Sequence, residues 1–205
     1  METSIRSVDL SDAHAIREIY APFISDNATS FEVVVPDLAE MECRIQAQRD
    51  RYPWLVFERD HTVLGYAYAS AHRARQAYQW CVEVSVYVHP KAHRCGVGRA
   101  LYAALFDLLR RQGYVNAYAG ITLPNPASLG LHESLGFVPV GVFSRIGFKF
   151  DRWHDVAWLQ LRLLEDPRPP HDLLPAAGLL QERGVAAMLE TCARSIRVDE
   201  VRRPA

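Results

Sequence analysis

A glycine-containing loop near the middle of the chain has the residue types that bind phosphate groups. An apolar strand pattern ends at Val88, and Pro90, Gly96 and Gly98 follow before a helical pattern begins. A loop of this kind presents backbone N–H groups at the helix N-terminus, where the helix dipole favours an anion. Glycine lets the backbone approach a phosphate closely. The spacing predicts a pyrophosphate-binding loop, surrounded by the cationic or hydrogen-bonding side chains of Lys91, His93, Arg94 and Arg99.

Two common phosphate motifs are excluded by the residues around these glycines. A P-loop ends in Gly-Lys-Ser/Thr, whereas Gly98 is followed by Arg99 and Ala100. The dinucleotide-binding fingerprint needs three glycines at the start of a βαβ unit, and the loop has only two. On these residues alone, a turn on a solvated basic surface is the alternative interpretation.

A carboxylate lies within the apolar strand that leads into this loop. Glu83 shares one face of the predicted strand 80–88 with Cys81, while Val82 and Val84 share the other. A carboxylate inside a central strand is costly without a role, which makes Glu83 a candidate general base. A structural ion pair is the alternative. Cys81 is a possible nucleophile, but no histidine partner for it is evident.

A second candidate lies on the predicted helix after Pro124. Asn125, Ser128 and His132 are spaced so that they share one helix face. Histidine titrates near neutral pH and therefore suits acid or base catalysis. The alternatives are a core histidine bonded to the backbone and an asparagine that only caps the helix.

Composition limits the classes of protein to which the chain can belong. Its 205 residues are 49% hydrophobic, which fits one globular domain with a sizeable core. A net charge of -1 argues against nucleic acid as the main partner. The first residues do not resemble a signal peptide, and no apolar run approaches the roughly 18 residues of a membrane helix. The four cysteines are scattered, so we expect no metal site, no disulfide framework and a cytoplasmic location.

Periodicity and turn residues predict alternating strands and helices. The predicted strands are 5–8, 54–59, 62–70, 80–88, 114–121, 137–145 and 153–163, and the predicted helices are 10–20, 38–51, 97–112 and 126–135. Pro22 is expected to end or kink the first helix. The order β-α-α-β-β-β-α-β-α-β-β predicts an α/β fold, an α+β mixed sheet with helices on both faces. We expect residues 1–165 to form this domain and 166–205 to be a proline-rich linker and C-terminal extension, helical or disordered.

The element order and the loop at residues 93–98 resemble the GCN5-related N-acetyltransferases, and within them the phosphinothricin N-acetyltransferase group. The matching segments are 51–56 (RYPWLV), Tyr78-x-Trp80-x-x-Glu83, 86–90 (VYVHP), 123–125 (LPN), 132–137 (HESLGF), 147–149 (GFK) and 153–156 (WHDV). The resemblance covers about residues 4–165. His93 stands where the family loop begins with Gln or Arg, so we expect the affinity for the cofactor to shift without being lost.

The resemblance implies that acetyl-CoA is the co-substrate. Its pyrophosphate would lie on the glycine loop, and its pantetheine arm would pair like a strand with the backbone of β-strand residues 86–88. The cofactor-binding residues that this implies are Val86, Tyr87, Val88, His93, Arg94, Cys95, Gly96, Val97, Gly98, Arg99, Asn125 and Ser128. Glu83 matches the family's catalytic glutamate. His132 stands where much of the superfamily has a tyrosine that protonates the thiolate.

The same resemblance implies a substrate site formed by Phe31, Arg73, Arg75 and Tyr78. Guanidinium groups bind carboxylate, phosphinate or sulfoximine oxygens well. The sequence therefore predicts direct acetylation of the α-amino group of L-phosphinothricin, L-methionine sulfoximine or L-methionine sulfone, by a homodimer. The alternatives are an acetyltransferase for general amino acids or small amines, and a non-catalytic acyl-CoA-binding sensor.

Overall fold

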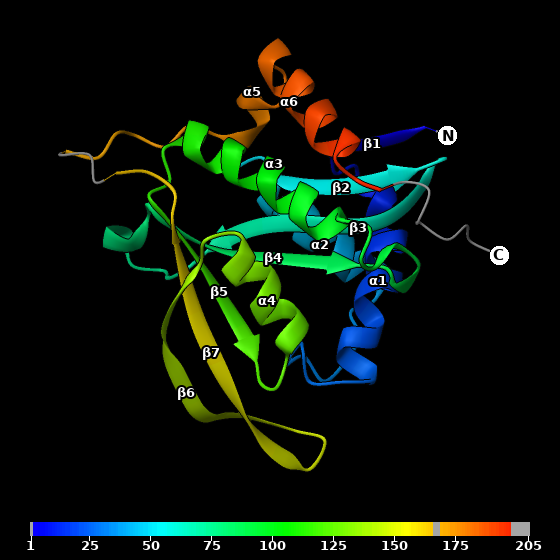
Figure 1. The fold of residues 1–205 in the computed structure, drawn as a ribbon, viewed down its shortest axis with the longest axis vertical. Helices are drawn as coiled ribbons and strands as arrows, with labels where there is room; N and C mark the ends of the chain where they lie inside the picture. Colours follow the sequence, from blue (N-terminus) through cyan, green and yellow to red (C-terminus); the bar gives the residue numbers. More distant parts are fainter. Residues whose placement is uncertain (1, 166–168, 198–205) are drawn as a thin grey trace.

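The computed structural model describes residues 2–165 and 169–197. In this part of the chain seven strands form one sheet in the order β1-β2-β3-β4-β5-β7-β6 (Figure 1). Neighbouring strands are antiparallel, apart from the parallel pair β4 and β5. The strands are β1 (Thr3–Ser7), β2 (Trp54–Arg59), β3 (Thr62–Ala71), β4 (Cys81–Val88), β5 (Asn116–Thr122), β6 (Val138–Lys149) and β7 (Arg152–Arg162).

Helices cover both faces of the sheet, as the predicted order requires. The helices are α1 (Ala13–Ser25), α2 (Leu38–Gln48), α3 (Val97–Gln112), α4 (Pro126–Ser134), α5 (Ala176–Leu179) and α6 (Arg183–Arg194). Strand β2 shows how alternation separates the two layers. Leu55 and Phe57 pack with α3 in one cluster, whereas Trp54 and Val56 pack with α1 and α2 in another. The predicted mixed α/β fold is confirmed.

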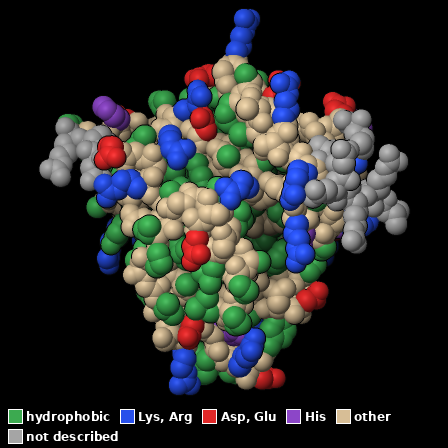
Figure 2. Space-filling view, in the orientation of Figure 1, with side chains coloured by type: hydrophobic (Ala, Val, Ile, Leu, Met, Phe, Trp, Pro, Cys, Tyr) green, Lys and Arg blue, Asp and Glu red, His purple; other side chains and the backbone are tan. Residues whose placement is uncertain are grey.

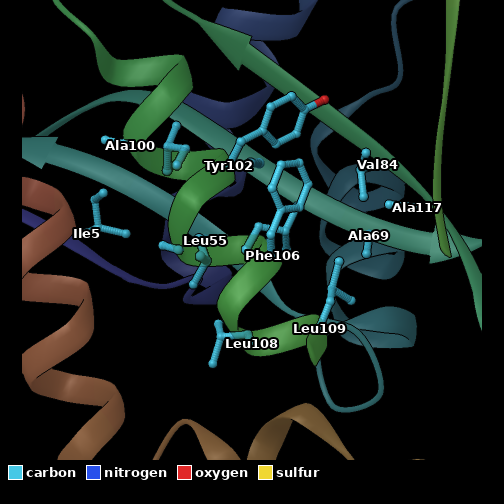
Figure 3. Packing of buried hydrophobic residues seen from close by; sticks show 14 of the residues in the cluster. Ile5, Leu55, Ala69, Val84, Ala100, Tyr102, Phe106, Leu108, Leu109 and Ala117 are labelled. Atoms are coloured by element: carbon cyan, nitrogen blue, oxygen red, sulfur yellow. The ribbon is translucent and has the colours of Figure 1, made fainter. Parts of the chain in front are cut away.

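Helix α3 has the largest share of the core. Its residues Tyr102, Phe106 and Leu109 point towards the sheet and belong to the same buried cluster as Val84 of β4 and Ala69 of β3 (Figure 3). The helix ends at Gly113, whose φ of 96° is the left-handed conformation that glycine adopts easily. Burial of each large apolar side chain adds about 1.5–3 kcal/mol to the free energy of unfolding. This packing holds the β4–loop–α3 segment in place.

The first helix differs from its prediction. Asp9 caps a 3-10 turn at Leu10–Asp12, and α1 then runs from Ala13 to Ser25 with Pro22 inside it. Of the two expected effects of Pro22, an end or a kink of the helix, the first is wrong, because the helix continues to Ser25. Pro22 has no N–H to donate, but its carbonyl still accepts hydrogen bonds from the backbone N–H of Asp26 and the side-chain amide of Asn27, both at 3.1 Å. The last helical turn is therefore kept.

The segment 176–197 packs against the same core. Val185 and Leu189 of α6 are buried in the α3 cluster, together with Ile196 just after the helix. The chain then reaches the glycine loop, where the Arg197 N–H donates to the Cys95 carbonyl at 2.9 Å. Within the described residues, no helix has the length and apolar character needed to cross a membrane.

Candidate active site

The two parallel strands at the centre of the sheet pair only briefly and then separate. Residues 81–83 of β4 pair with residues 116–118 of β5. Beyond this point β4 continues beside β3, whereas β5 continues beside β7. The backbone groups of residues 84–88 that point away from β3 can therefore pair with an extended ligand. Glu83 is the last residue of β4 that pairs with β5, at the point where the gap opens.

A cavity of about 300 Å³ lies in this gap. Glu83, Val84 and Ser85 line it from β4, and Gly120 and Thr122 line it from β5. Its remaining lining residues are Thr29, Phe31, Phe143, Ile146, Val156 and Trp158. Polar groups of β4 and β5 and apolar side chains of β6 and β7 converge on the cavity, which suits a small molecule that carries both polar and apolar groups.

Glu83 is accessible from the cavity and has a protein partner on one oxygen. Its side chain is 35% exposed, and its Oε1 lies 3.0 Å from Nδ1 of His72, which is 13% exposed. Glu83 was a candidate base from its residue type and its place in the strand, whereas His72 had no predicted role. Ser70 of β3 is paired with Glu83, and His72 follows two residues later on the same side of the chain, so the β3–β4 register places it near this carboxylate. Glu83 has the geometry of a base whose side chain is held by a neighbour.

The glycine loop has the conformation expected of an anion site. Gly96 has a φ of 91° and is the N-cap of α3, so the first-turn N–H groups of the helix have no intrahelical acceptor. Arg94 also has a positive φ, 62°. Cys95 and Val97 are buried, so they can offer a ligand only backbone groups.

Several of the polar side chains predicted to bind the cofactor have protein partners, and those of His93 and Arg99 lie nearest the glycine loop. His93 Nε2 lies 2.9 Å from the Val88 carbonyl, which accepts its proton. Arg99 donates to Ser134, to the hydroxyl at 2.6 Å and to the carbonyl at 3.3 Å. These contacts connect the loop to β4 and to the end of α4. The contribution of either side chain to cofactor binding stays a prediction.

His132 lies in the core and does not line the cavity. It is 4% exposed, and its Nδ1 lies 2.8 Å from the Ser128 carbonyl, so Nδ1 donates. Nε2 then accepts the hydroxyl proton of Tyr102 at 3.1 Å. Burial lowers the pKa of His132, and the hydrogen bond to Ser128 offsets part of this effect. Asn125 caps α4 by accepting the Ser128 N–H at 3.1 Å. A catalytic role for His132 stays a prediction.

Phe31 is the predicted substrate-binding residue that lines the cavity. Its ring lies against Gly147 of β6, where an added Cβ would be 2.2 Å from the nearest ring atom. The loop that carries Phe31 is held by Lys149, whose Nζ donates to the carbonyls of Ser30 at 2.7 Å and Asn27 at 3.2 Å. Burial lowers the pKa of Lys149. Phe31 thus forms a wall between the α1–α2 loop and β6.

The other predicted substrate residues lie on the connection between β3 and β4. Arg73 and Arg75 are exposed and do not line the cavity. The Tyr78 ring contacts His72 edge to face, with 6.3 Å between ring centroids. Contact of the two arginines with a substrate stays a prediction.

Cys81 lies two residues before Glu83 in β4, on the same face of the strand. Burial raises the pKa of its thiol, and a hydrogen bond to Asn116 offsets part of this. The thiolate needed for nucleophilic attack is therefore disfavoured at neutral pH.

Comparisons with known proteins agree with this geometry. A family model described as an acetyltransferase (GNAT) domain matches residues 5–158. The chain is 37% identical over 175 residues to a phosphinothricin N-acetyltransferase of Streptomyces viridochromogenes, covering 85% of this chain and 95% of that protein. It is 39% identical over 170 residues to an L-methionine sulfoximine/L-methionine sulfone acetyltransferase of Salmonella typhimurium, covering 81% and 98%.

A solved structure shows the same fold. It is a phosphinothricin acetyltransferase from Sinorhizobium meliloti in complex with acetyl-CoA, with a TM-score of 0.77 and 34% sequence identity. The match covers 84% of this chain and 94% of that one. The segment after residue 165 extends beyond the 5–158 range of the family model.

Proposed function

Because the chain belongs to the GNAT acetyltransferase family, we propose that it transfers an acetyl group from acetyl-CoA to the α-amino group of a small amino acid analogue. The proposed substrates are L-phosphinothricin, L-methionine sulfoximine and L-methionine sulfone, which occur in the names of two relatives. The observation that carries the proposal is the position of Glu83 at the opening between β4 and β5, beside a cavity of about 300 Å³.

The fold offers acetyl-CoA two kinds of backbone site. Residues 84–88 offer a strand edge that suits the amides of the pantetheine arm, since pairing with β5 has stopped. The first turn of α3 and its N-cap Gly96 offer N–H donors to the pyrophosphate. When bound, acetyl-CoA supplies the acetyl thioester. Glu83 is the last residue of β4 that pairs with β5, and it lines the cavity. An acetyl thioester at the end of a pantetheine arm bound along residues 84–88 would therefore lie close to Glu83.

Glu83 is the proposed base. The amine arrives as an ammonium ion and must lose a proton before its nitrogen can form a bond to the acetyl carbon. Glu83 accepts that proton directly or through one water molecule, while backbone N–H groups of β4 stabilise the charge on the carbonyl oxygen. The carbon–sulfur bond then breaks, and the leaving thiolate takes up a proton. The raised pKa of Cys81 supports direct transfer without an acyl-enzyme.

His132 is the proposed second group. Its Nε2 shares a hydrogen bond with the Tyr102 hydroxyl, so a proton can pass between these two side chains. We propose that the pair supports protonation of the thiolate from the α4 side of the gap. Because both ring nitrogens of His132 already have partners, the role needs a rearrangement that opens one of them.

A broader acceptor range is the second candidate function. It is favoured by the position of Arg73 and Arg75, which are exposed and lie outside the lining of the cavity. Without a guanidinium group in the pocket, an oxygen-bearing side chain gains no charged partner there. A general amino acid acetyltransferase would fit this arrangement.

We further propose that two copies of the chain associate through the β6 edge, in the cytoplasm. Strand β6 is the last strand of the sheet, and its side chains Val138, Val140, Val142, Ile146 and Phe148 are each more than half exposed. Hydrophobic side chains are gathered over the lower part of the molecule in Figure 2, where Figure 1 places β6 and β7. An apolar edge strand of this length is normally covered.

The molar mass in solution tests this interface. Light scattering coupled to size-exclusion chromatography should give twice the mass of one chain, and the Val140→Lys variant should give the mass of one chain.

Thiol release from acetyl-CoA tests the proposed function. The acceptors are L-phosphinothricin, L-methionine sulfoximine, L-methionine sulfone, glutamate, methionine and spermidine. We expect saturable turnover with the first three and none with glutamate or spermidine. Turnover of methionine at a similar kcat/KM would favour the broader candidate. Binding of coenzyme A without turnover of any acceptor would reject the enzymatic proposal and favour the acyl-CoA-binding sensor.

A further inference from the structure

The carboxylate of Glu83 is held by a histidine that the proposed mechanism has not used. His72 follows the end of β3, and its Nδ1 lies 3.0 Å from Oε1 of Glu83. An ionised carboxylate has no proton to donate, so Nδ1 must be the donor whenever Glu83 is able to act as a base. The hydrogen bond therefore occupies Oε1 and leaves Oε2 for the cavity that Glu83 lines.

Aromatic side chains from three other elements fix the imidazole ring. The ring stacks on Tyr118 of β5, with 4.5 Å between centroids and 17° between planes. Trp158 of β7 contacts the ring edge to face at 5.8 Å, and Tyr78 does so at 6.3 Å. With 13% of the side chain exposed, the ring has little freedom to turn away from Glu83. Such packing is what holds a base in one orientation.

We propose that His72 is a positioning residue for Glu83, and this inference rests on the proposed acetyl transfer. By binding Oε1, His72 selects one side-chain rotamer of Glu83 and presents Oε2 to the amine. Without this hydrogen bond the carboxylate, which is 35% exposed, rotates among several conformations. Misplacement of a reacting group by about 1 Å can reduce a rate by roughly 100-fold. We expect the loss to appear in kcat, because His72 acts on the carboxylate and does not itself line the cavity.

Two substitutions separate positioning from packing. His72→Phe keeps a flat ring for stacking on Tyr118 but removes the donor, whereas His72→Asn keeps an N–H donor near the place of Nδ1 and removes the ring. We expect His72→Phe to lower kcat by at least about 10-fold, with KM for acetyl-CoA and the melting temperature unchanged. We expect His72→Asn to keep kcat within about 3-fold of the original chain. Full kcat in His72→Phe, or equal losses in both variants, would overturn the inference.

A measurement on the unsubstituted protein keeps the inference testable if a variant does not fold. Long-range proton–nitrogen NMR spectra of the imidazole ring report which nitrogen carries the proton. We expect Nδ1 of His72 to be protonated at pH 8, and its signal to move when Glu83→Gln is introduced. A ring protonated at Nε2 alone would overturn the inference. Failure of the protein to acetylate any amine would reject the proposed function, while these spectra would still report on the hydrogen bond.

Discussion

Glu83 and His132 were both candidates for acid–base catalysis, and their surroundings differ. Glu83 lies at an opening of the sheet, lines a cavity, and has one oxygen bound by His72. His132 is 4% exposed, and both of its ring nitrogens have partners in α3 and α4. Residue type makes both side chains candidates for acid–base catalysis. Accessibility from the cavity and a free hydrogen-bonding atom distinguish Glu83 from His132. We expect chemistry to depend first on Glu83 and stability to depend first on His132.

Removal of the base should have the largest effect. Glu83→Gln keeps the shape of the side chain but cannot accept the proton of the ammonium, so kcat should fall by about 100- to 10,000-fold. The melting temperature should stay within about 2 °C, because the side chain is partly exposed. Steady-state thiol release and calorimetry measure the two quantities. The control is Glu133→Gln on the exposed side of α4. An unchanged kcat in Glu83→Gln would remove the distinction between the two sites.

Adding a methyl group at Gly147 of β6, where the Phe31 ring packs, should have the next largest effect on activity. Gly147→Ala would bring a Cβ to 2.2 Å from the Phe31 ring, so the ring must move into or away from the cavity. We expect KM for the amine to rise by about 10-fold and the free energy of unfolding to fall by about 1–3 kcal/mol. Gly141→Ala in the same strand is the matched control, since nothing lies within 4 Å of its added Cβ. Equal kinetics for the two variants would show that Phe31 does not bound the substrate site.

The buried pair of Tyr102 and His132 should control stability. His132→Asn keeps a donor for the Ser128 carbonyl but leaves the Tyr102 hydroxyl without its acceptor. An unsatisfied buried hydroxyl costs about 1–3 kcal/mol, which urea unfolding at pH 7.5 would measure. His14→Asn, with a side chain that is 66% exposed, is the control and should cost less than about 0.5 kcal/mol. A loss of stability equal to that of the control would contradict the structural role.

Because the pKa of His132 is lowered, its contribution to the free energy of unfolding depends on pH. Burial depresses the pKa in the folded state below that in the unfolded chain, so the unfolded chain binds the proton first as the pH falls. This contribution to stability is complete above about pH 7 and is lost as the pH falls through about 6.5, the unperturbed value, towards the folded pKa. The free energy of unfolding of the original chain should therefore drop between pH 7 and pH 5, and less so in His132→Asn. Parallel curves for the two proteins would contradict this assignment.

The smallest effect is expected at the glycine loop. The guanidinium of Arg197 donates to the Arg94 carbonyl, and its backbone N–H donates to Cys95. Arg197→Ala removes the first contact and keeps the second, so the loop should become slightly less ordered. We expect the Kd for acetyl-CoA to rise by about 2- to 5-fold, at about 1 kcal/mol or less per lost hydrogen bond. Isothermal titration measures it, with the exposed Arg194→Ala as control. An unchanged Kd would show that this contact does not support the loop.

Local patterns predicted most of the fold. Alternation in β4, the apolar stripe of α3 and the Asn125 cap depend on neighbouring residues and are visible in the sequence. The course of α1 through Pro22 was missed, because the carbonyl bonds that keep the last turn come from residues beyond the proline.

The site was less predictable, because its contacts join distant elements. The hydrogen bond between His72 and Glu83 needs the β3–β4 register, and the contact of Phe31 with Gly147 joins residues more than a hundred positions apart. Arg73 and Arg75 have the charge that suits an acidic substrate, but the direction of a side chain on a loop is not encoded by its neighbours. Residue types therefore identified Glu83, which lines the cavity, as a candidate base, and left its partner His72 unassigned. The role of Glu83 as a base stays a prediction.

A crystal structure with coenzyme A and N-acetyl-L-methionine sulfone, a product of the proposed reaction, is the most direct test. The account predicts that the product amide nitrogen lies within about 3 Å of Glu83 Oε2, or one water molecule away from it, with His72 still bound to Oε1. It also predicts that the pantetheine arm pairs with the backbone of residues 84–88. A product amide that lies beside His132 and away from Glu83 would contradict the account.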